Sequence, residues 1–308
     1  MALAAGEVVW PAVGEVALAL VVAGAWLALY LMGVVRLRGG PRAVPRWRIA
    51  CFVVGVALVV VALASPVAAL ADELFSAHMG EHLLLGDLVA LLFALGMTGP
   101  LLVPLLRLPG MGVLRMLVHP VVAYVLWAVN LYAWHVAGLH EQAVRDDVVH
   151  ALQHVLFIAL GLNMWLALLG PLPKPSWFGN AAILGYVVAV RLTAAVLGNA
   201  LLFGGGAFYG VYAPGEAAWG ISPAADQVTA GAVMMVEGSL LTLGLLCWLF
   251  LRTARQTDER QDLVEFAAAH GIELSERRAA RAVGAGRGAE LRERIAAGEA
   301  PERAGAAR

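Results

Sequence analysis

The sequence is poor in charged residues, which make up 14% of its 308 positions, against about 25% in ordinary soluble proteins. Apolar residues other than glycine make up 61%, whereas soluble domains reach only about 45–50% even when glycine is counted. This balance excludes an ordinary soluble domain, because too few polar side chains are present to cover its surface. The composition therefore predicts a membrane protein.

Cysteines and known catalytic motifs are also scarce. The two cysteines, Cys51 and Cys247, each lie inside an apolar run, where they are expected to be small buried side chains rather than a disulfide or a metal pair. The sequence contains no glycine-rich phosphate loop and no nucleophile motif. We therefore expect neither an enzyme nor a protein that binds nucleotides or nucleic acid.

Seven apolar runs recur along the chain, and each is long enough for the roughly 20 residues of helix that cross a hydrocarbon core. They cover residues 14–35, 49–70, 81–103, 119–138, 149–169, 181–203 and 227–251. The first run lacks a basic segment before it, so we interpret it as a retained span rather than a cleaved signal. An alternative with eight spans would split the third run at Gly99-Pro100, but the remainder is short and proline-rich. The predicted fold class is an all-α, polytopic membrane bundle of seven transmembrane helices.

Charged residues alternate between the two sides of this predicted bundle. The loops after the first, third and fifth runs carry Arg36, Arg38, Arg42, Arg46, Arg48, Arg107, Arg115 and Lys174, and the C-terminal tail adds eleven Arg. The opposite side carries Glu7, Glu15, Asp72, Glu73, Glu141, Asp146, Asp147 and Glu216, with Arg145 as its basic residue. Because Lys and Arg favour the cytoplasmic side, we predict that the N-terminus lies outside and the C-terminus in the cytoplasm.

The chain is expected to have two parts. Residues 1–252 form the seven-span transmembrane domain, and residues 253–308 form a cytoplasmic charged tail rich in Ala, Arg, Glu and Gly. Residues 261–274 have the pattern of an amphipathic helix, and the end of the tail has the composition of a disordered segment. The basic residues of the tail suit topology and contact with membrane lipid.

Histidines cluster at the ends of three apolar runs. His78 and His82 precede or open the third run, and His150 and His154 open the fifth. Since four residues make about one helical turn, each pair lies on one helix face with its rings roughly 6 Å apart. His135 ends the fourth run, at the same predicted outer boundary. We therefore expect these imidazoles to share a metal site at the outer face, because neutral imidazole binds metal ions.

Further polar and sulfur-containing residues lie near this predicted site. Asp226 opens the seventh run at the same boundary, where it is either a metal ligand or the N-cap of its own helix. Met234 and Met235 follow two to three turns later; their thioethers suit Cu(I), and packing explains them as well. His140 lies between two runs and is either an outer ligand or a solvated side chain. The other two histidines are expected to be unrelated to the site.

Two ionisable residues fall near the middle of predicted spans. Arg191 lies in the sixth run and Glu237 in the seventh, and because a lone charge there is costly, we predict a buried ion pair between them. Asp87, about a turn beyond His82, is either polar contact between helices or an acceptor that orients an imidazole.

Several motifs occur in a fixed order along the chain. They are HMGEHLLL (78–85), GMTGPLL (96–102), WHVAGLHEQAV (134–144), VHALQHVLFIALGLNMWLALLG (149–170) and DQVTAGAVMMVEG (226–238). Together they resemble the CtaG-type cytochrome c oxidase assembly factor family, a bacterial family of seven-span membrane proteins, over roughly residues 10–252. The positions that match the family pattern are His78, His82, His135, His154, Asp226 and Gln227. Met234 and Met235 stand where the family pattern often has a Trp.

The resemblance implies a function in the bacterial plasma membrane. It implies that the protein helps to mature a haem-copper oxidase by binding copper and delivering it to the catalytic subunit of that oxidase, its expected partner. Two other functions stay open. A membrane cytochrome would hold haem b between facing histidines, and a copper permease would need a polar path across the membrane, for which the inner half offers little beyond Arg191 and Glu237. The sequence leaves open the identity and oxidation state of the metal and the oligomeric state.

Overall fold

The structure is a computed structural model that describes residues 10–108, 110, 112–284 and 286–298. These residues form helices and connecting turns, with no β-strand among them. Six helices are long and apolar enough to cross a membrane, and a seventh span results if two helices that meet at an angle of 74° are counted as one. The structure therefore confirms the predicted all-α polytopic bundle.

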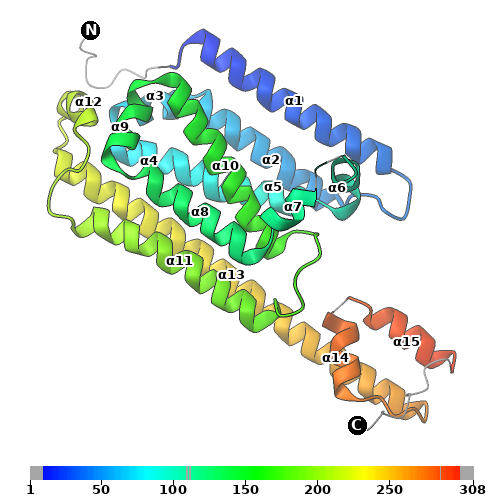
Figure 1. Cartoon of the computed structure of the whole chain (residues 1–308). Coiled ribbons are helices and arrows are strands. Elements are labelled where there is room, and N and C mark those ends of the chain that lie inside the picture. Colours follow the sequence, from blue (N-terminus) through cyan, green and yellow to red (C-terminus); the bar gives the residue numbers. More distant parts are fainter. Residues whose placement is uncertain (1–9, 109, 111, 285, 299–308) are drawn as a thin grey trace. The chain divides into compact units, whose positions relative to one another are not determined.

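The helices of the chain fall into long spans and short connecting pieces (Figure 1). The long helices are α1 (Val13–Leu37), α2 (Arg46–Leu63), α10 (Asp147–Leu169), α11 (Asn180–Phe203) and α13 (Pro223–Ala269). A further span consists of α4 (Phe75–Leu83), the π-helical segment η1 (Leu84–Val89) and α5 (Ala90–Gly96). The bent pair comprises α8 (Pro120–Trp134) and α9 (Ala137–Arg145). The remaining pieces are α3 (Pro66–Glu73), α6 (Gly99–Leu106), α7 (Gly112–Leu117), the 3-10 turn η2 (Gly210–Tyr212), α12 (Ala213–Trp219), α14 (Glu276–Gly284) and α15 (Gly288–Ala296).

Several predicted span boundaries differ from those of the structure. The second span ends at Leu63, because the Ser65-Pro66 step starts the separate helix α3, whose first turn is capped by the Ser65 side chain. The third span begins at Phe75, six residues before its predicted start, and ends at Gly96. The chain does break before Gly99, but α6 has only eight residues and is too short to cross a membrane. The alternative with eight spans is therefore wrong.

The chain forms two compact units, one up to Leu241 and one from Thr242 onward, so that the boundary lies within α13. The predicted division at residue 252 lies further along the same helix. In the second unit, α14 and α15 pack with the end of α13 around a core of Leu263, Ala267, Leu274, Ala279, Val283, Leu291 and Ile295. The described part of the predicted tail is therefore largely helical. The predicted disordered end includes residues 299–308, which lie outside the described residues.

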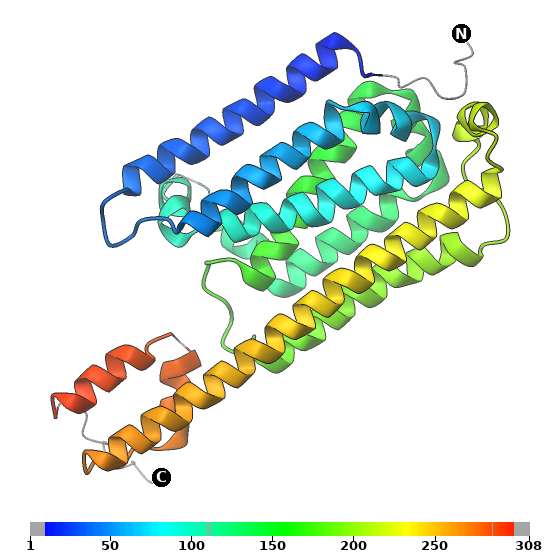
Figure 2. The same cartoon turned by 180° about the vertical axis from the view of Figure 1, so that it is seen from behind.

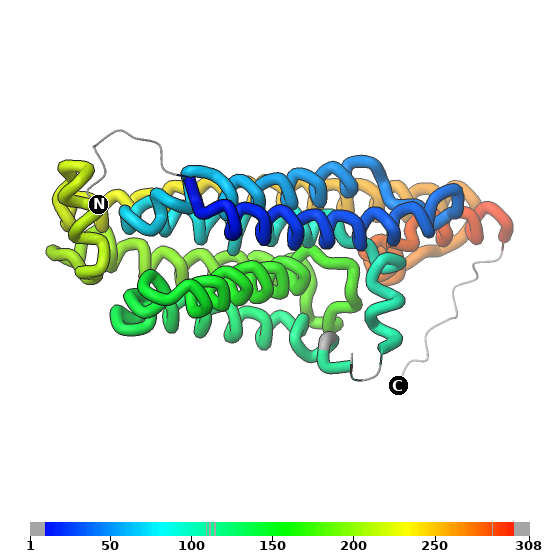
Figure 3. Tube along the Cα trace, turned by 90° about the horizontal axis from the view of Figure 1, so that it is seen from above, coloured from blue at the N-terminus to red at the C-terminus, as the bar shows by residue number. Residues whose placement is uncertain are grey.

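Close backbone packing in the first unit brings α4 and α10 together. Helix α10 packs against α8 and against the η1–α5 segment, and in Figure 3 the helices α8 and α10 (green) lie on the other side of the bundle from α1 and α2 (blue). Gly161 of α10 lies against the carbonyl group of Gly86 in η1, where a Cβ atom would collide with the carbonyl oxygen. The two helices can therefore approach at backbone distance, which places the first turns of α10 beside α4.

Short helices gather at one end of this unit. Figure 1 shows α3, α9 and α12 at the end where α10 and α13 begin, and α3 contacts α12 while α9 contacts η2. Seen from behind, α4 lies beside the first part of α13 (Figure 2). The predicted histidine clusters lie at this end of the bundle.

Candidate metal centre

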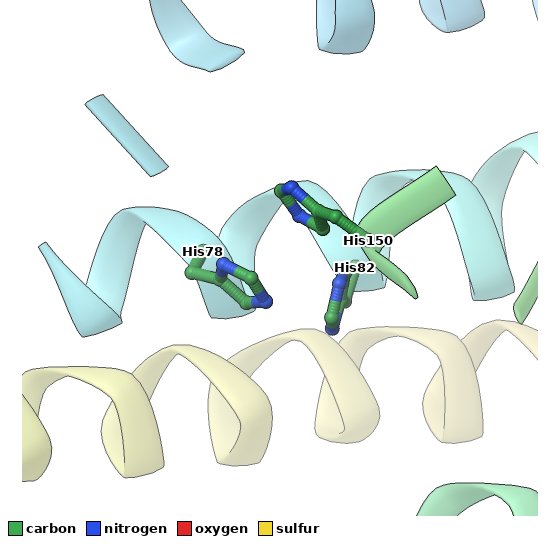
Figure 4. A group of neighbouring side chains, drawn as sticks. All are labelled: His78, His82 and His150. Atoms are coloured by element: carbon green, nitrogen blue, oxygen red, sulfur yellow. The ribbon is translucent and has the colours of Figure 1, made fainter. Parts of the chain in front are cut away.

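Three histidines from two helices form the centre of a buried cluster. His78 and His82 lie one turn apart on α4, and His150 reaches toward them from the first turn of α10 (Figure 4). The ring centroids of His78 and His82 are 4.2 Å apart, and those of His78 and His150 are 5.1 Å apart. One ring nitrogen of each residue lies within 4.8 Å of the other two. The three rings are therefore close enough to share one metal ion.

The nitrogens of this three-histidine group have few protein partners. His78 is fully buried and His82 is 4% exposed. Both nitrogens of His82 and Nε2 of His150 have no hydrogen-bond partner among the described residues, and His78 has only a poorly aligned contact with the backbone of Ala71. A buried polar group without a partner costs about 1–3 kcal/mol. A bound metal ion would satisfy these nitrogens, since imidazole is a ligand for Cu, Zn, Fe and Ni.

A second group shares His150 with the first. Its other members are Glu81 and His154, and ligand atoms of the three lie within 4.8 Å of one another. Glu81 is 1% exposed, and its Oε2 lies 3.4 Å from Nε2 of His154. Glu81 was absent from the predicted ligand set; the signal for it was an acid beside His82 in an apolar helix, where a buried carboxylate needs a proton or a cation.

His140 belongs to the cluster and does not lie in a solvated loop. It is part of α9, is fully buried, and its ring centroid is 4.9 Å from that of His78. Its Nε2 lies 2.8 Å from the hydroxyl of Tyr212 in η2. Burial, reinforced by the nearby carboxylate of Asp72, raises the pKa of the Tyr212 hydroxyl well above its usual range. Tyr212 therefore keeps its proton and forms a neutral hydrogen bond that fixes the His140 ring.

His135 lies at the C-terminal end of α8 and faces a methionine. Its Nδ1 is 2.7 Å from the carbonyl oxygen of Leu131, and its Nε2 is 3.3 Å from Sδ of Met79. The ring centroid of His135 is 6.3 Å from that of His140. His135 therefore adjoins the three-histidine group through Met79 and His140 rather than joining it directly.

Asp226 and Gln227 hold the backbone around the cluster. Both carboxylate oxygens of Asp226 accept hydrogen bonds from the first N–H groups of α4, at Phe75 (2.7 Å) and Ser76 (3.1 Å). Helix α13 begins at Pro223, so Asp226 lies in its first turn, and the expectation that Asp226 is the N-cap of its own helix is wrong. The amide of Gln227 accepts from the Phe208 N–H and donates to the carbonyl of Gly206. The two residues therefore fix the start of α4 and the loop before η2.

The charged residues near mid-span form a group of three. Arg191 lies 3.8 Å from Glu237, which confirms the predicted contact, and 3.6 Å from Asp87, which was not predicted as its partner. Asp87 and Arg191 are 8% and 9% exposed. Asp87 lies within the π-helical segment η1, which begins two residues after His82, and π-turns within helices often occur at functional sites.

The structure gathers the five predicted histidines at one end of the bundle and gives the sixth predicted ligand, Asp226, other partners. Metal binding by these residues stays a prediction. The residues that sequence reasoning missed are Glu81, Met79 and Tyr212. Tyr212 lies in a Gly-rich, aromatic loop without periodicity, so no sequence pattern placed it beside a histidine.

One family of known proteins matches most of this chain. The family described as "Cytochrome c oxidase caa3 assembly factor (Caa3_CtaG)" matches residues 28–256. "Uncharacterized protein Mb0105" from Mycobacterium bovis is 28% identical over 258 residues, which cover 76% of this chain and 38% of that protein. "Uncharacterized protein ML1998" from Mycobacterium leprae is 26% identical over 246 residues, which cover 74% and 37%. The chain thus spans less than two fifths of the length of these relatives. No solved structure matches it significantly.

The family match covers the helices that carry the histidine cluster, from α4 through the first turns of α13. The apolar helices themselves are those of a protein that crosses a membrane several times. The chain therefore belongs to the cytochrome c oxidase caa3 assembly factor family and is a multi-pass protein of the bacterial membrane.

Proposed function

We propose that this protein binds copper at its histidine cluster and delivers it to the catalytic subunit of a cytochrome c oxidase, acting as a metal carrier without catalysing a reaction. The observation that carries the proposal is the set of buried ring nitrogens of His78 and His82: those of His82 have no hydrogen-bond partner among the described residues, and those of His78 have only a poorly aligned contact with the backbone of Ala71. Family membership supplies the oxidase as the partner. Imidazole and buried carboxylate suit several transition metals, so the choice of copper rests on the copper content of haem-copper oxidases.

Charge supports a site at the outer face of the plasma membrane. The histidine cluster lies at the end of the bundle that carries the α3 and α9 connections, with Asp72, Glu73, Glu141 and Asp146. The connections at the opposite end carry Arg38, Arg42, Arg107, Arg115 and Lys174. Because Lys and Arg favour the cytoplasmic side, the cluster faces outward, where copper arrives without crossing the membrane.

The ligand arrangement suits a carrier. The three-histidine group and the group of Glu81, His150 and His154 share His150, so an ion can change ligands in small steps. A site with three protein ligands keeps a position open, as catalytic zinc sites do, whereas a closed four-ligand cage holds its ion for structural purposes. An open position lets a partner protein supply the next ligand and take the ion.

The close packing of the cluster favours a metal ion over haem. The cavity that reaches His82 and His135 has a volume of about 30 Å³, two to three times the roughly 10–15 Å³ that one water molecule requires. Ring centroids within the cluster are 4.2 to 6.3 Å apart, so a porphyrin could enter only if the helices separated. An absorption spectrum of the purified protein tests the haem alternative, because bound haem gives a Soret band.

Copper analysis of purified variants tests the proposal. Protein produced with added copper and then dialysed should retain copper, and the double variant His78→Ala, His82→Ala should lose it. His119→Ala is the matched control, since His119 lies before α8 at the opposite end of that helix and should leave copper binding unchanged. Equal copper in the wild type and the double variant would refute the proposal.

A further inference from the structure

We propose a second cation site beside the three-histidine group, formed by Sδ of Met79, Nε2 of His135 and the ring of His82, and suited to a soft monovalent cation such as Cu(I). The inference rests on the proposed function and deepens it, because it names the oxidation state that the protein holds. Its ligands differ from those of the first group by including a thioether.

The first observation is a contact between two atoms that both carry lone pairs. Nδ1 of His135 lies 2.7 Å from the carbonyl oxygen of Leu131, and a carbonyl oxygen can only accept, so Nδ1 carries the proton. In a neutral imidazole the other nitrogen is then an acceptor. That nitrogen, Nε2, lies 3.3 Å from Sδ of Met79, and a thioether has no hydrogen to donate. Nothing in the protein therefore bridges these two atoms, whereas a cation would bind both.

The second observation is an unpartnered side chain in the same place. His82 is 4% exposed, and both of its nitrogens lack a hydrogen-bond partner of ordinary geometry among the described residues. It lines the same small cavity as Met79 and His135, and Met234 lies on the wall of that cavity. The volume of about 30 Å³ exceeds the roughly 10–15 Å³ that one water molecule requires, so a single ion fits. Three side chains with potential ligand atoms thus line one cavity that is large enough for an ion.

The ligand atoms distinguish this second site from the three-histidine group. Thioether sulfur is a soft ligand that selects Cu(I), whereas carboxylate oxygen suits harder ions. The group around Glu81 contains a carboxylate. Met79, His82 and His135 offer none, and the two carboxylates that line the same cavity, Asp87 and Glu237, lie within 4 Å of Arg191. His82 belongs to both the three-histidine group and the sulfur-containing group, so an ion can move between them while one ligand stays bound.

The test uses Ag(I), a soft cation without redox chemistry, and Zn(II), a probe for the imidazole and carboxylate groups. Met79→Leu should weaken Ag(I) binding by about tenfold or more, while Zn(II) binding stays unchanged. Leucine and methionine have similar volumes, so packing is kept. Met164→Leu is the matched control, because Met164 is as deeply buried in α10, at 1% exposed against 2% for Met79, and does not line the cavity; it should leave both ions unaffected.

X-ray absorption of the wild type loaded with Cu(I) under anaerobic conditions identifies the atoms that are bound to copper. A sulfur atom should appear among the nearest neighbours of copper, and it should disappear in Met79→Leu. The inference is overturned if sulfur is missing from the wild-type spectrum, or if Met79→Leu and Met164→Leu bind Ag(I) equally. A wild type that retains no copper at all would instead overturn the proposed function.

Discussion

The carboxylate of Asp226 accepts a hydrogen bond of 2.7 Å from the backbone N–H of Phe75, across 151 positions of sequence. Phe75 is the first residue of α4, and the first N–H groups of a helix have no partner within it. A negative charge at this position also interacts favourably with the helix dipole. Asp226, at the start of α13, therefore fixes the position of the first turn of α4, the helix that carries His78 and His82.

We predict that Asp226→Ala lowers the free energy of unfolding by about 0.5–2 kcal/mol, as loss of an N-cap does. Metal affinity should fall with it, because α4 loses its fixed starting point, but the number of bound ions should stay the same. Thermal unfolding and metal titration of the purified variant measure the two effects. Asp226→Asn keeps one oxygen acceptor and should bind metal nearly as the wild type does. If Asp226→Asn abolishes binding instead, Asp226 is a ligand.

The contact between Gly161 and Gly86 predicts a strong effect of a small side chain. A methyl group on Gly161 would collide with the backbone of η1, so Gly161→Ala should push α10 away from α4 and separate His150 from His78. We expect a lower unfolding temperature and a loss of metal affinity. Gly80→Ala is the control, because Gly80 lies in α4 with no atom within 4 Å of the added Cβ, and alanine favours helix by about 1 kcal/mol. Equal stability of the two variants would contradict this account of the packing.

We predict that Asp87, Arg191 and Glu237 contribute unequally to the free energy of unfolding. Arg191 lies between the two carboxylates, at 3.6 and 3.8 Å, so its removal leaves two acids without a cation. Breaking a buried pair costs about 3–5 kcal/mol, and we expect Arg191→Ala to reach this range and to exceed Glu237→Ala. Unfolding of both single variants and the double variant measures the coupling. Additive losses would show that the long contact between Arg191 and Glu237 contributes nothing.

The spans could be predicted because each is an apolar run of membrane-spanning length, but their ends could not. The start of the third span at Phe75 depends on hydrogen bonds that the Phe75 and Ser76 N–H groups donate to Asp226, and no local pattern reveals a cap so distant in sequence. The end of the second span at Leu63 is different, since the Ser65-Pro66 step was visible in the sequence. Local signals therefore set some boundaries, and tertiary contacts set others.

The candidate site also depends partly on local sequence patterns and partly on contacts between helices. The spacing of His78 and His82, and of His150 and His154, placed each pair on one helix face, which is a property of the helix alone. The contact of His135 with Met79 joins α8 to α4, and it depends on how the helices pack. Periodicity therefore predicted the histidines, whereas the partners between helices required the structure.

Copper delivery predicts a specific defect in living cells. His82 belongs to the three-histidine group, and His154 belongs to the group with Glu81, so the loss of either ring weakens one half of the cluster. We expect the bundle to fold without either ring, because neither side chain accepts or donates a short hydrogen bond between helices: both nitrogens of His82 lack a partner among the described residues, and Nε2 of His154 has only a contact of 3.4 Å with Glu81. The variants should therefore reach the membrane in normal amounts.

We predict that cells carrying His82→Ala or His154→Ala accumulate oxidase that contains haem but is short of copper and has reduced turnover. The expected reason is that a carrier without one of these imidazoles holds its ion too weakly to be loaded, whereas a copper carrier has no part in haem insertion. Metal analysis and the haem spectrum of the same membranes measure both cofactors, with His119→Ala as the control. Full copper content with normal turnover would contradict the delivery role, and oxidase lacking haem as well would indicate that the cluster serves haem insertion instead.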